Sequence, residues 1–137
     1  IQGAAIHVRA GDLLRQPENL LMTIDYYENS MKMLSQTYGI NKFLIVTEDV
    51  GFAKSYFADA EINYSLQYQT SNELEDFITL MRHQYLISAN STFSWVAGAV
   101  GLAELFISTE YFYKPADKPK TARNEIIMSF AGDMIKS

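Results

Sequence analysis

The first residues that could do chemistry are an arginine and an aspartate near the start of the chain. Arg9 directly follows the nearly continuous apolar segment 3–8, and Asp12 comes three residues later. Such a run predicts a strand covered on both faces, and ligands of open α/β sheets bind beyond the carboxyl ends of these strands. The guanidinium of Arg9 suits a phosphate, because it can donate two charge-assisted hydrogen bonds at once. A surface arginine paired with Asp12 is the alternative, and this segment alone does not decide between them.

A second polar cluster lies between the apolar segment 85–89 and a predicted helix. It contains one amide and three hydroxyls, those of Asn90, Ser91, Thr92 and Ser94. The free N–H groups and the dipole at a helix N-terminus favour an anion, so this junction predicts a phosphate site. Plain N-capping by Asn90 or Ser91 is the alternative, and capping requires only one of the four side chains.

Acidic residues occur at two further positions of interest. Thr47, Glu48 and Asp49 end the apolar segment 42–47, and Asp49 is a natural N-cap for the short helix predicted after it. Two adjacent carboxylates are a weak signal for a metal, so we predict no metal site. Asp76 is expected at the edge of a helix face formed by Leu74, Phe77, Ile78 and Met81. An aspartate there is usually solvated, but it can also point at a ligand over the sheet edge.

The elements that must position these clusters alternate along the chain. Strands are expected at 3–8, 42–47, 61–69, 85–89 and 104–108. The longest of the intervening helices carries one apolar stripe, formed by Leu20, Ile24, Tyr27, Met31, Leu34 and Tyr38. Gly39 is expected to end this helix. This alternation predicts an α/β fold, a Rossmann-like parallel sheet with helices on both faces. The polar clusters after the first, second and fourth strands then line one crevice. Residues 126–136 form a tail with no clear prediction.

Composition narrows the classes of partner. With 137 residues, the chain can form one domain with a sizeable core. A net charge of −5 argues against a nucleic-acid-binding surface, so an anion must be held by a few local groups. No apolar run approaches the roughly 20 residues that span a bilayer, and the lack of cysteine fits a reducing compartment. We expect a cytoplasmic protein, with peripheral membrane association as the alternative. Because the chain begins at Ile1, we also expect it to be a piece of a larger protein.

Several of these runs resemble the signatures of one enzyme family. Residues 7–12 (HVRAGD) resemble the H-V-R-R-G-D signature of the fucosyltransferase superfamily. Asp76, His83 and above all residues 89–95 (ANSTFSW) look like the downstream signature of glycosyltransferase family 11, the α-1,2-fucosyltransferases. Residues 47–49 (TED) stand where that family carries S-D-D. The resemblance covers essentially the whole chain.

This resemblance implies both a fold and a reaction. The family is built as a two-lobed GT-B enzyme, and residues 1–137 look like its donor-binding, nucleotide lobe. The implied activity is the inverting transfer of L-fucose from GDP-fucose to the 2-hydroxyl of a galactoside acceptor. No cofactor or metal is expected. The implied partners are the nucleotide-sugar donor, the galactoside or glycan acceptor, and an N-terminal acceptor lobe in the parent protein.

The resemblance also assigns roles to residues. Arg9 would grip the β-phosphate and stabilise the leaving GDP, and His7 and Asp76 would contact the nucleoside. The phosphate end would be lined by Asn90, Ser91, Thr92 and Ser94, with Thr47 and Asp49 completing the donor site. Asp12 is the candidate catalytic base, although it could instead hold Arg9 or the turn, and the base could come from the other lobe.

Three positions depart from the family pattern. Ala10 replaces the second arginine of the signature, Val96 replaces a second tryptophan, and Glu48 replaces an aspartate. The loss of one positive charge at Ala10 favours an alternative function, a phosphate-binding Rossmann-like module without catalysis. A phosphoacceptor domain that uses Glu48 and Asp49 is disfavoured, because it would need acidic residues where this chain has Arg9.

Overall fold

We analysed a computed structural model, which describes residues 3–9, 24–58, 64–89, 91–109, 124–128 and 134–136. The described strands are β1 (Ala4–Val8), β2 (Lys42–Thr47), β3 (Ser65–Gln69), β4 (Tyr85–Ile87), β5 (Leu105–Thr109), β6 (Glu125–Met128) and β7 (Met134–Lys136). The described helices are α2 (Ile24–Tyr38), α3 (Val50–Ala58), α4 (Glu73–Arg82) and α5 (Thr92–Val100).

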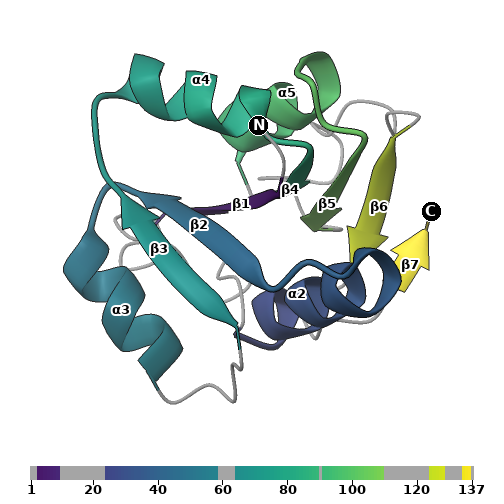
Figure 1. Cartoon of the computed structure of the whole chain (residues 1–137). Coiled ribbons are helices and arrows are strands. Elements are labelled where there is room, and N and C mark those ends of the chain that lie inside the picture. The colour runs from purple at the N-terminus through teal and green to yellow at the C-terminus, as the bar shows by residue number, and fades with distance from the viewer. Residues whose placement is uncertain are drawn as a thin grey trace.

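The strands form one sheet in the order β3-β2-β1-β4-β5-β6-β7 (Figure 1). The first six of these strands are mutually parallel, and β7 pairs antiparallel with β6. The prediction of a Rossmann-like parallel sheet is therefore confirmed, and β3 lies at one edge of the sheet. The two C-terminal strands, β6 and β7, were not predicted.

Helices cover both faces of the sheet. Alternate residues of β1 point to opposite faces, so Ile6 joins the core beneath α2 and α3, whereas Ala5 joins the core beneath α4 and α5. Figure 1 shows the two layers, with α4 and α5 above the sheet and α2 and α3 below it. Because the chain leaves β1 for β2 through α2 and leaves β4 for β5 through α5, the connections diverge between β1 and β4. In open α/β sheets this divergence marks the place where ligands bind.

The long helix α2 follows its predicted stripe at most positions. Tyr27, Met31 and Leu34 are fully buried. Gly39 ends the helix at a φ of 71°, a conformation that favours glycine, and its N–H donates to the carbonyl of Ser35 at 2.9 Å. Tyr38 is an exception, because it is 45% exposed and lies against the ring of Tyr85 at 4.8 Å between centroids.

The predicted apolar face of α4 is only partly buried. Phe77 and Met81 pack on the core, whereas Leu74 and Ile78 are 69% and 38% exposed. The buried residues of this helix are Asp76 and Leu80. Asn72 is its N-cap, because its side chain accepts from the N–H of Glu75 at 2.8 Å. The helix is thus rotated so that a carboxylate points inward over the sheet.

Candidate functional site

The structure brings the predicted polar clusters to one edge of the sheet. We call this edge the carboxyl edge, defined by the ends of β2, β1 and β4 after Thr47, Val8 and Ile87. The three strands are neighbours and parallel, with Val8 opposite Thr47 and Ile6 opposite Ile87. Arg9, the residue directly after β1, is partly exposed at this edge. The predicted crevice residues therefore share one location.

The N-terminus of α5 lies at the end of β4, and no side chain of the described residues caps it. Ser91 is the N-cap residue, yet its side chain makes no capping hydrogen bond. Its hydroxyl is buried and has no partner in the described part of the chain. Simple capping by Ser91, one of the two alternatives considered above, is thus not what this hydroxyl does. The first N–H groups of α5 and a buried hydroxyl remain available for an anion.

Ser94 has a different role at the same junction. It is fully buried, and its Oγ accepts from the N–H of Ala89 at 3.1 Å and lies 3.3 Å from the Oγ of Ser88. These contacts fix the first turn of α5 to the end of β4. Direct contact between Ser94 and a donor stays a prediction.

His7 lies on β1 beneath the first turn of α5. Its ring is 6% exposed and packs against Phe93, with 5.3 Å between the ring centroids. Burial, and then the positive charge of Arg9, lower the pKa of His7 to about 3, so its imidazole is neutral at physiological pH. The buried Nδ1 has no hydrogen-bond partner among the described residues. A neutral imidazole with one unused nitrogen can bond to either a donor or an acceptor on a ligand.

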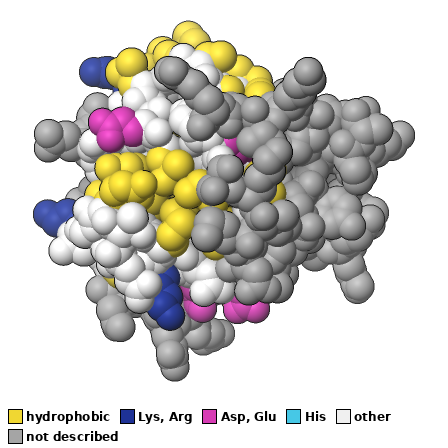
Figure 2. All heavy atoms as spheres, turned by 90° about the vertical axis from the view of Figure 1, so that its right-hand side faces the viewer, with side chains coloured by type: hydrophobic (Ala, Val, Ile, Leu, Met, Phe, Trp, Pro, Cys, Tyr) yellow, Lys and Arg dark blue, Asp and Glu magenta, His cyan; other side chains and the backbone are white. Residues whose placement is uncertain are grey.

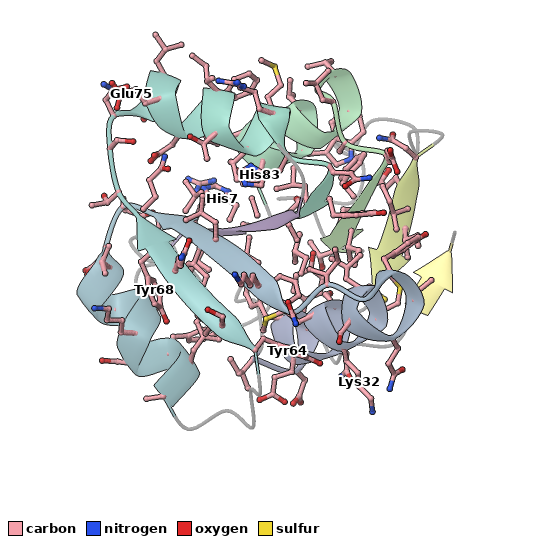
Figure 3. All side chains as sticks on the ribbon, viewed as in Figure 1. His7, Lys32, Tyr64, Tyr68, Glu75 and His83 are labelled. Atoms are coloured by element: carbon pink, nitrogen blue, oxygen red, sulfur yellow. The ribbon has the colours of Figure 1, made fainter. Side chains whose placement is uncertain are left out.

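Asp76 presents a carboxylate from the first turn of α4. It is 8% exposed, and its Oδ1 accepts from the hydroxyl of Ser71 at 2.7 Å and from the amide of Gln69 at 3.3 Å. Its other oxygen, Oδ2, accepts no hydrogen bond within the described ranges, which leaves it available for a ligand N–H. In Figure 3, His7 lies between the sheet and α4, and Glu75 stands at the N-terminal end of that helix.

A pocket of about 470 Å³ adjoins this carboxylate at the β3 edge. It is lined by Gln69, Ser71, Glu75, Ile78 and Thr79. The amide of Gln69 also donates to the hydroxyl of Thr79 at 2.9 Å, so the pocket wall and the position of Asp76 depend on the same side chain. The pocket could hold part of a planar, hydrogen-bonding group.

Thr47 and Asp49 form a tight local structure at the end of β2. Asp49 caps α3, because its Oδ1 accepts from the N–H of Phe52 at 2.9 Å. Thr47 is buried, and its Oγ1 accepts from the N–H of Asp49 at 3.2 Å. The capping role considered for Asp49 is therefore confirmed. Contact of either residue with a donor stays a prediction.

The remaining predicted positions cannot be placed. Ala10, Asp12 and Asn90 lie outside the described residues, and only the backbone of Thr92 is described, as the first residue of α5. Within the described ranges, no group of three or more His, Asp or Glu side chains could hold a metal ion. On the face seen in Figure 2, the described Lys, Arg, Asp and Glu side chains occur singly or in small groups. With a net charge of −5, the chain would have to hold an anionic ligand through a few local donors.

Tyr26 and Tyr27 support the carboxyl edge from the α2 side of the sheet. From the sequence, Tyr27 was placed only in an apolar stripe, and Tyr26 was not considered. The hydroxyl of Tyr27 donates to the carbonyl of His7 at 2.9 Å. The hydroxyl of Tyr26 donates to the carbonyls of Ser88 at 2.7 Å and Ile107 at 3.2 Å. Burial raises the pKa of both hydroxyls well above the usual range, so both stay protonated donors. These contacts could have been anticipated from the rule that a buried tyrosine hydroxyl needs a hydrogen-bond partner.

Comparison with known proteins now identifies the family. The sequence model of glycosyl transferase family 11 matches residues 2–127. The chain belongs to glycosyl transferase family 11. Membership of family 11 implies transferase activity. No curated protein and no solved structure matches the chain significantly. None of the helices described for this family 11 chain is long and apolar enough to cross a membrane.

Proposed function

We propose that this chain is the GDP-fucose-binding lobe of a two-lobed, GT-B type α-1,2-fucosyltransferase. The observation that carries the proposal is at the N-terminus of α5, where the buried Ser91 hydroxyl makes no capping hydrogen bond and has no partner among the described residues. The ring of His7 lies against Phe93 in the same helical turn, and Arg9 follows His7 by two residues. Helix N–H groups, a hydroxyl and a guanidinium are the donors that a diphosphate requires.

The nucleoside is assigned to the region between His7 and Asp76. The free Oδ2 of Asp76 can accept from the N–H groups of guanine, while Ser71 and Gln69 hold its Oδ1 in place. Asp76 and α5 stand on the same face of the sheet, since α4 and α5 share one core cluster. This arrangement supports a base near α4 and phosphates near α5.

The same groups can assist the transfer. Breaking the bond between fucose and the β-phosphate develops negative charge on the departing GDP. Arg9 and the N–H groups of α5 would stabilise that charge without a metal, because they are already oriented before the reaction. The acceptor hydroxyl would attack from the opposite side, which inverts the anomeric centre. Asp12 remains the candidate base, and a cytoplasmic location remains part of the proposal.

The donor site is tested by titrating the chain with GDP in the presence of EDTA. Arg9→Ala should weaken GDP binding by about two orders of magnitude or more, because bidentate, charge-assisted hydrogen bonds are lost. Lys32→Ala is the matched control, since it also removes one positive charge but lies exposed on α2, away from the carboxyl edge (Figure 3). Failure of the unaltered chain to bind GDP would refute the proposal.

The assignment of the base is tested separately. Asp76→Asn replaces an acceptor oxygen by a donor and should weaken GDP binding by about tenfold, while binding of inorganic pyrophosphate stays unchanged. Equal loss for both ligands would contradict the assignment. Transfer itself requires a protein that contains both lobes, assayed with GDP-fucose and lactose. A protein that binds GDP but transfers no fucose would instead support the non-catalytic alternative.

A further inference from the structure

A buried carboxyl group lies behind the proposed phosphate site. Glu125 is the first residue of β6 and is only 2% exposed. Its Oε2 accepts from the indole Nε1 of Trp95 at 2.9 Å and from the hydroxyl of Ser108 on β5. One carboxyl oxygen thus joins β6, β5 and the first turn of α5.

Two further contacts fix the rest of α5 to the same strands. Asn124 donates from Nδ2 to the carbonyls of Gly98 at 3.3 Å and Ala103 at 2.9 Å. Gly98 packs directly on β5, because a Cβ atom at this position would lie 2.5 Å from the ring of Phe106. The ring of Trp95 also packs on Phe106, with 6.2 Å between centroids. From Trp95 to Gly98, the helix is therefore held against β5 and the start of β6.

The first turn of α5 needs these contacts. In most helices the N-cap side chain holds the first turn, but Ser91 makes no capping hydrogen bond. The turn is instead held on one side by Ser94, which bonds to the end of β4, and on the other side by Trp95, which bonds to Glu125. Removing either contact would let the N–H groups of the turn change direction.

A carboxylate at this position also has a cost that calls for an explanation. Burying a carboxylate costs several kcal/mol unless its hydrogen bonds are excellent, and an apolar side chain would pack against Trp95 and Phe106 at lower cost. What an apolar residue cannot supply is a directional acceptor for the indole N–H. A glutamate at position 125 therefore contributes to the orientation of the helix, which an apolar residue could not do even if it made the protein more stable.

We propose that Glu125 is a positioning residue for the anion site, which acts through Trp95 to aim the first N–H groups of α5. This inference rests on the proposed function, because it assumes that these N–H groups bind the diphosphate of a nucleotide. Glu125 itself touches no ligand. It fixes the geometry of the donors that do, and small displacements of such donors weaken binding markedly.

The experiment compares GDP with guanosine, which lacks phosphates, by NMR titration of the 137-residue chain. Glu125→Gln keeps the size of the side chain but weakens the bond to Trp95. It should raise the Kd for GDP by about tenfold, the equivalent of one weakened charge-assisted hydrogen bond, and change the Kd for guanosine less than twofold. Glu104→Gln is the matched control, since Glu104 is an exposed carboxylate close to the start of β5.

A second variant keeps the inference testable if Glu125→Gln does not fold. Trp95→Phe retains a ring against Phe106 but lacks the indole N–H, and it should show the same loss for GDP alone. The double variant should lose no more than the single ones, because both remove the same contact. In Glu125→Gln the emission of Trp95, the chain's single tryptophan, should also shift, which reports directly on the indole environment.

The outcomes separate the two proposals. If the unaltered chain binds neither GDP nor guanosine, the donor site and the role of Glu125 both fail. If it binds GDP but both variants weaken GDP and guanosine equally, or weaken neither, only the role of Glu125 fails. A fall in melting temperature without a change in the GDP to guanosine ratio would mean that Glu125 is merely structural, and it would also overturn the inference.

Discussion

Acid should destabilise this protein through one buried imidazole. Burial and the charge of Arg9 lower the pKa of His7 to about 3, whereas an imidazole in the unfolded chain titrates at about 6.5. The stabilising contribution of neutral His7 is therefore complete above the unfolded pKa and is lost as the pH falls towards the folded pKa. Between these values the unfolded chain takes up a proton that the folded chain refuses.

The size of the effect follows from the two pKa values. Each pH unit between about 6.5 and about 3 should lower the free energy of unfolding by about 1.4 kcal/mol. Acidification from about pH 7 to about pH 5.5 should accordingly cost about 1.3 kcal/mol, since part of this interval lies above the unfolded pKa. For a chain of this size that loss corresponds to a fall of roughly 5 °C in Tm.

The assay is urea unfolding of the unaltered chain and His7→Gln at the two pH values. Glutamine cannot gain a proton, so the variant should lose the contribution of His7 to the pH dependence, whatever its absolute stability. His83→Gln is the companion variant, because His83 is the chain's other histidine and burial lowers its pKa too. The double variant should be almost insensitive to pH in this interval.

The role of His7 in acid destabilisation would be contradicted if His7→Gln retained the full pH dependence. It would also be contradicted if the unaltered chain were equally stable at both pH values. A direct check is the NMR signal of the His7 ring, which should stay that of a neutral imidazole at about pH 5.5. A protonated ring in the folded chain under these conditions would show that water or a counter-charge reaches Nδ1.

Three further predictions concern stability, measured by urea unfolding at neutral pH. Gly98→Ala should lower the free energy of unfolding by about 1–3 kcal/mol, because the added Cβ would clash with the Phe106 ring at 2.5 Å; an unchanged value would contradict the close packing of α5. Tyr27→Phe should cost about 1–2 kcal/mol, because the carbonyl of His7 loses its donor, and a neutral effect would mean that water replaces the hydroxyl. Asn72→Ala should cost about 1 kcal/mol through loss of the α4 cap, and a Ser variant should recover most of it.

The parts of the fold that the sequence predicted correctly are those with a local signal. The strand β1, which precedes Arg9, and the strand β4, which precedes Ser91, are almost wholly apolar. This is the pattern of buried parallel strands. Gly39 marked the end of α2 because a left-handed residue there favours glycine. The strands β6 and β7 have only four and three residues, which is too short for a periodic pattern to stand out.

The orientation of α4 was predicted only in part, because polar contacts help to decide it. Counting apolar residues put Leu74 and Ile78 on the same face as Phe77 and Met81, but the buried side chains of the helix are those of Asp76 and Leu80. Ser71 and Gln69 satisfy this carboxylate from outside the helix. Periodicity within one helix cannot register hydrogen bonds that come from a neighbouring strand.

The sequence predicted which strand ends form the candidate site, but it did not predict the side-chain contacts there. The positions of Arg9 and Ser91 at strand ends follow from the alternation of elements. Whether Ser91 would cap α5 could not be predicted, because capping depends on backbone angles and side-chain direction at the junction. The hydrogen bond between Trp95 and Glu125 could not be predicted either, because the two residues are 30 positions apart in the chain.

The tyrosine hydroxyls of α2 also have a consequence for the order of folding. Tyr26 bonds to carbonyls 62 and 81 positions further along the chain. Contacts at such separations form only after a large loop has closed, which makes them slow to appear. We therefore expect the ends of β1, β4 and β5 to reach their final spacing late. During synthesis, a chain that has not yet reached β5 lacks the carbonyl of Ile107 and therefore cannot complete this hydrogen-bonded junction.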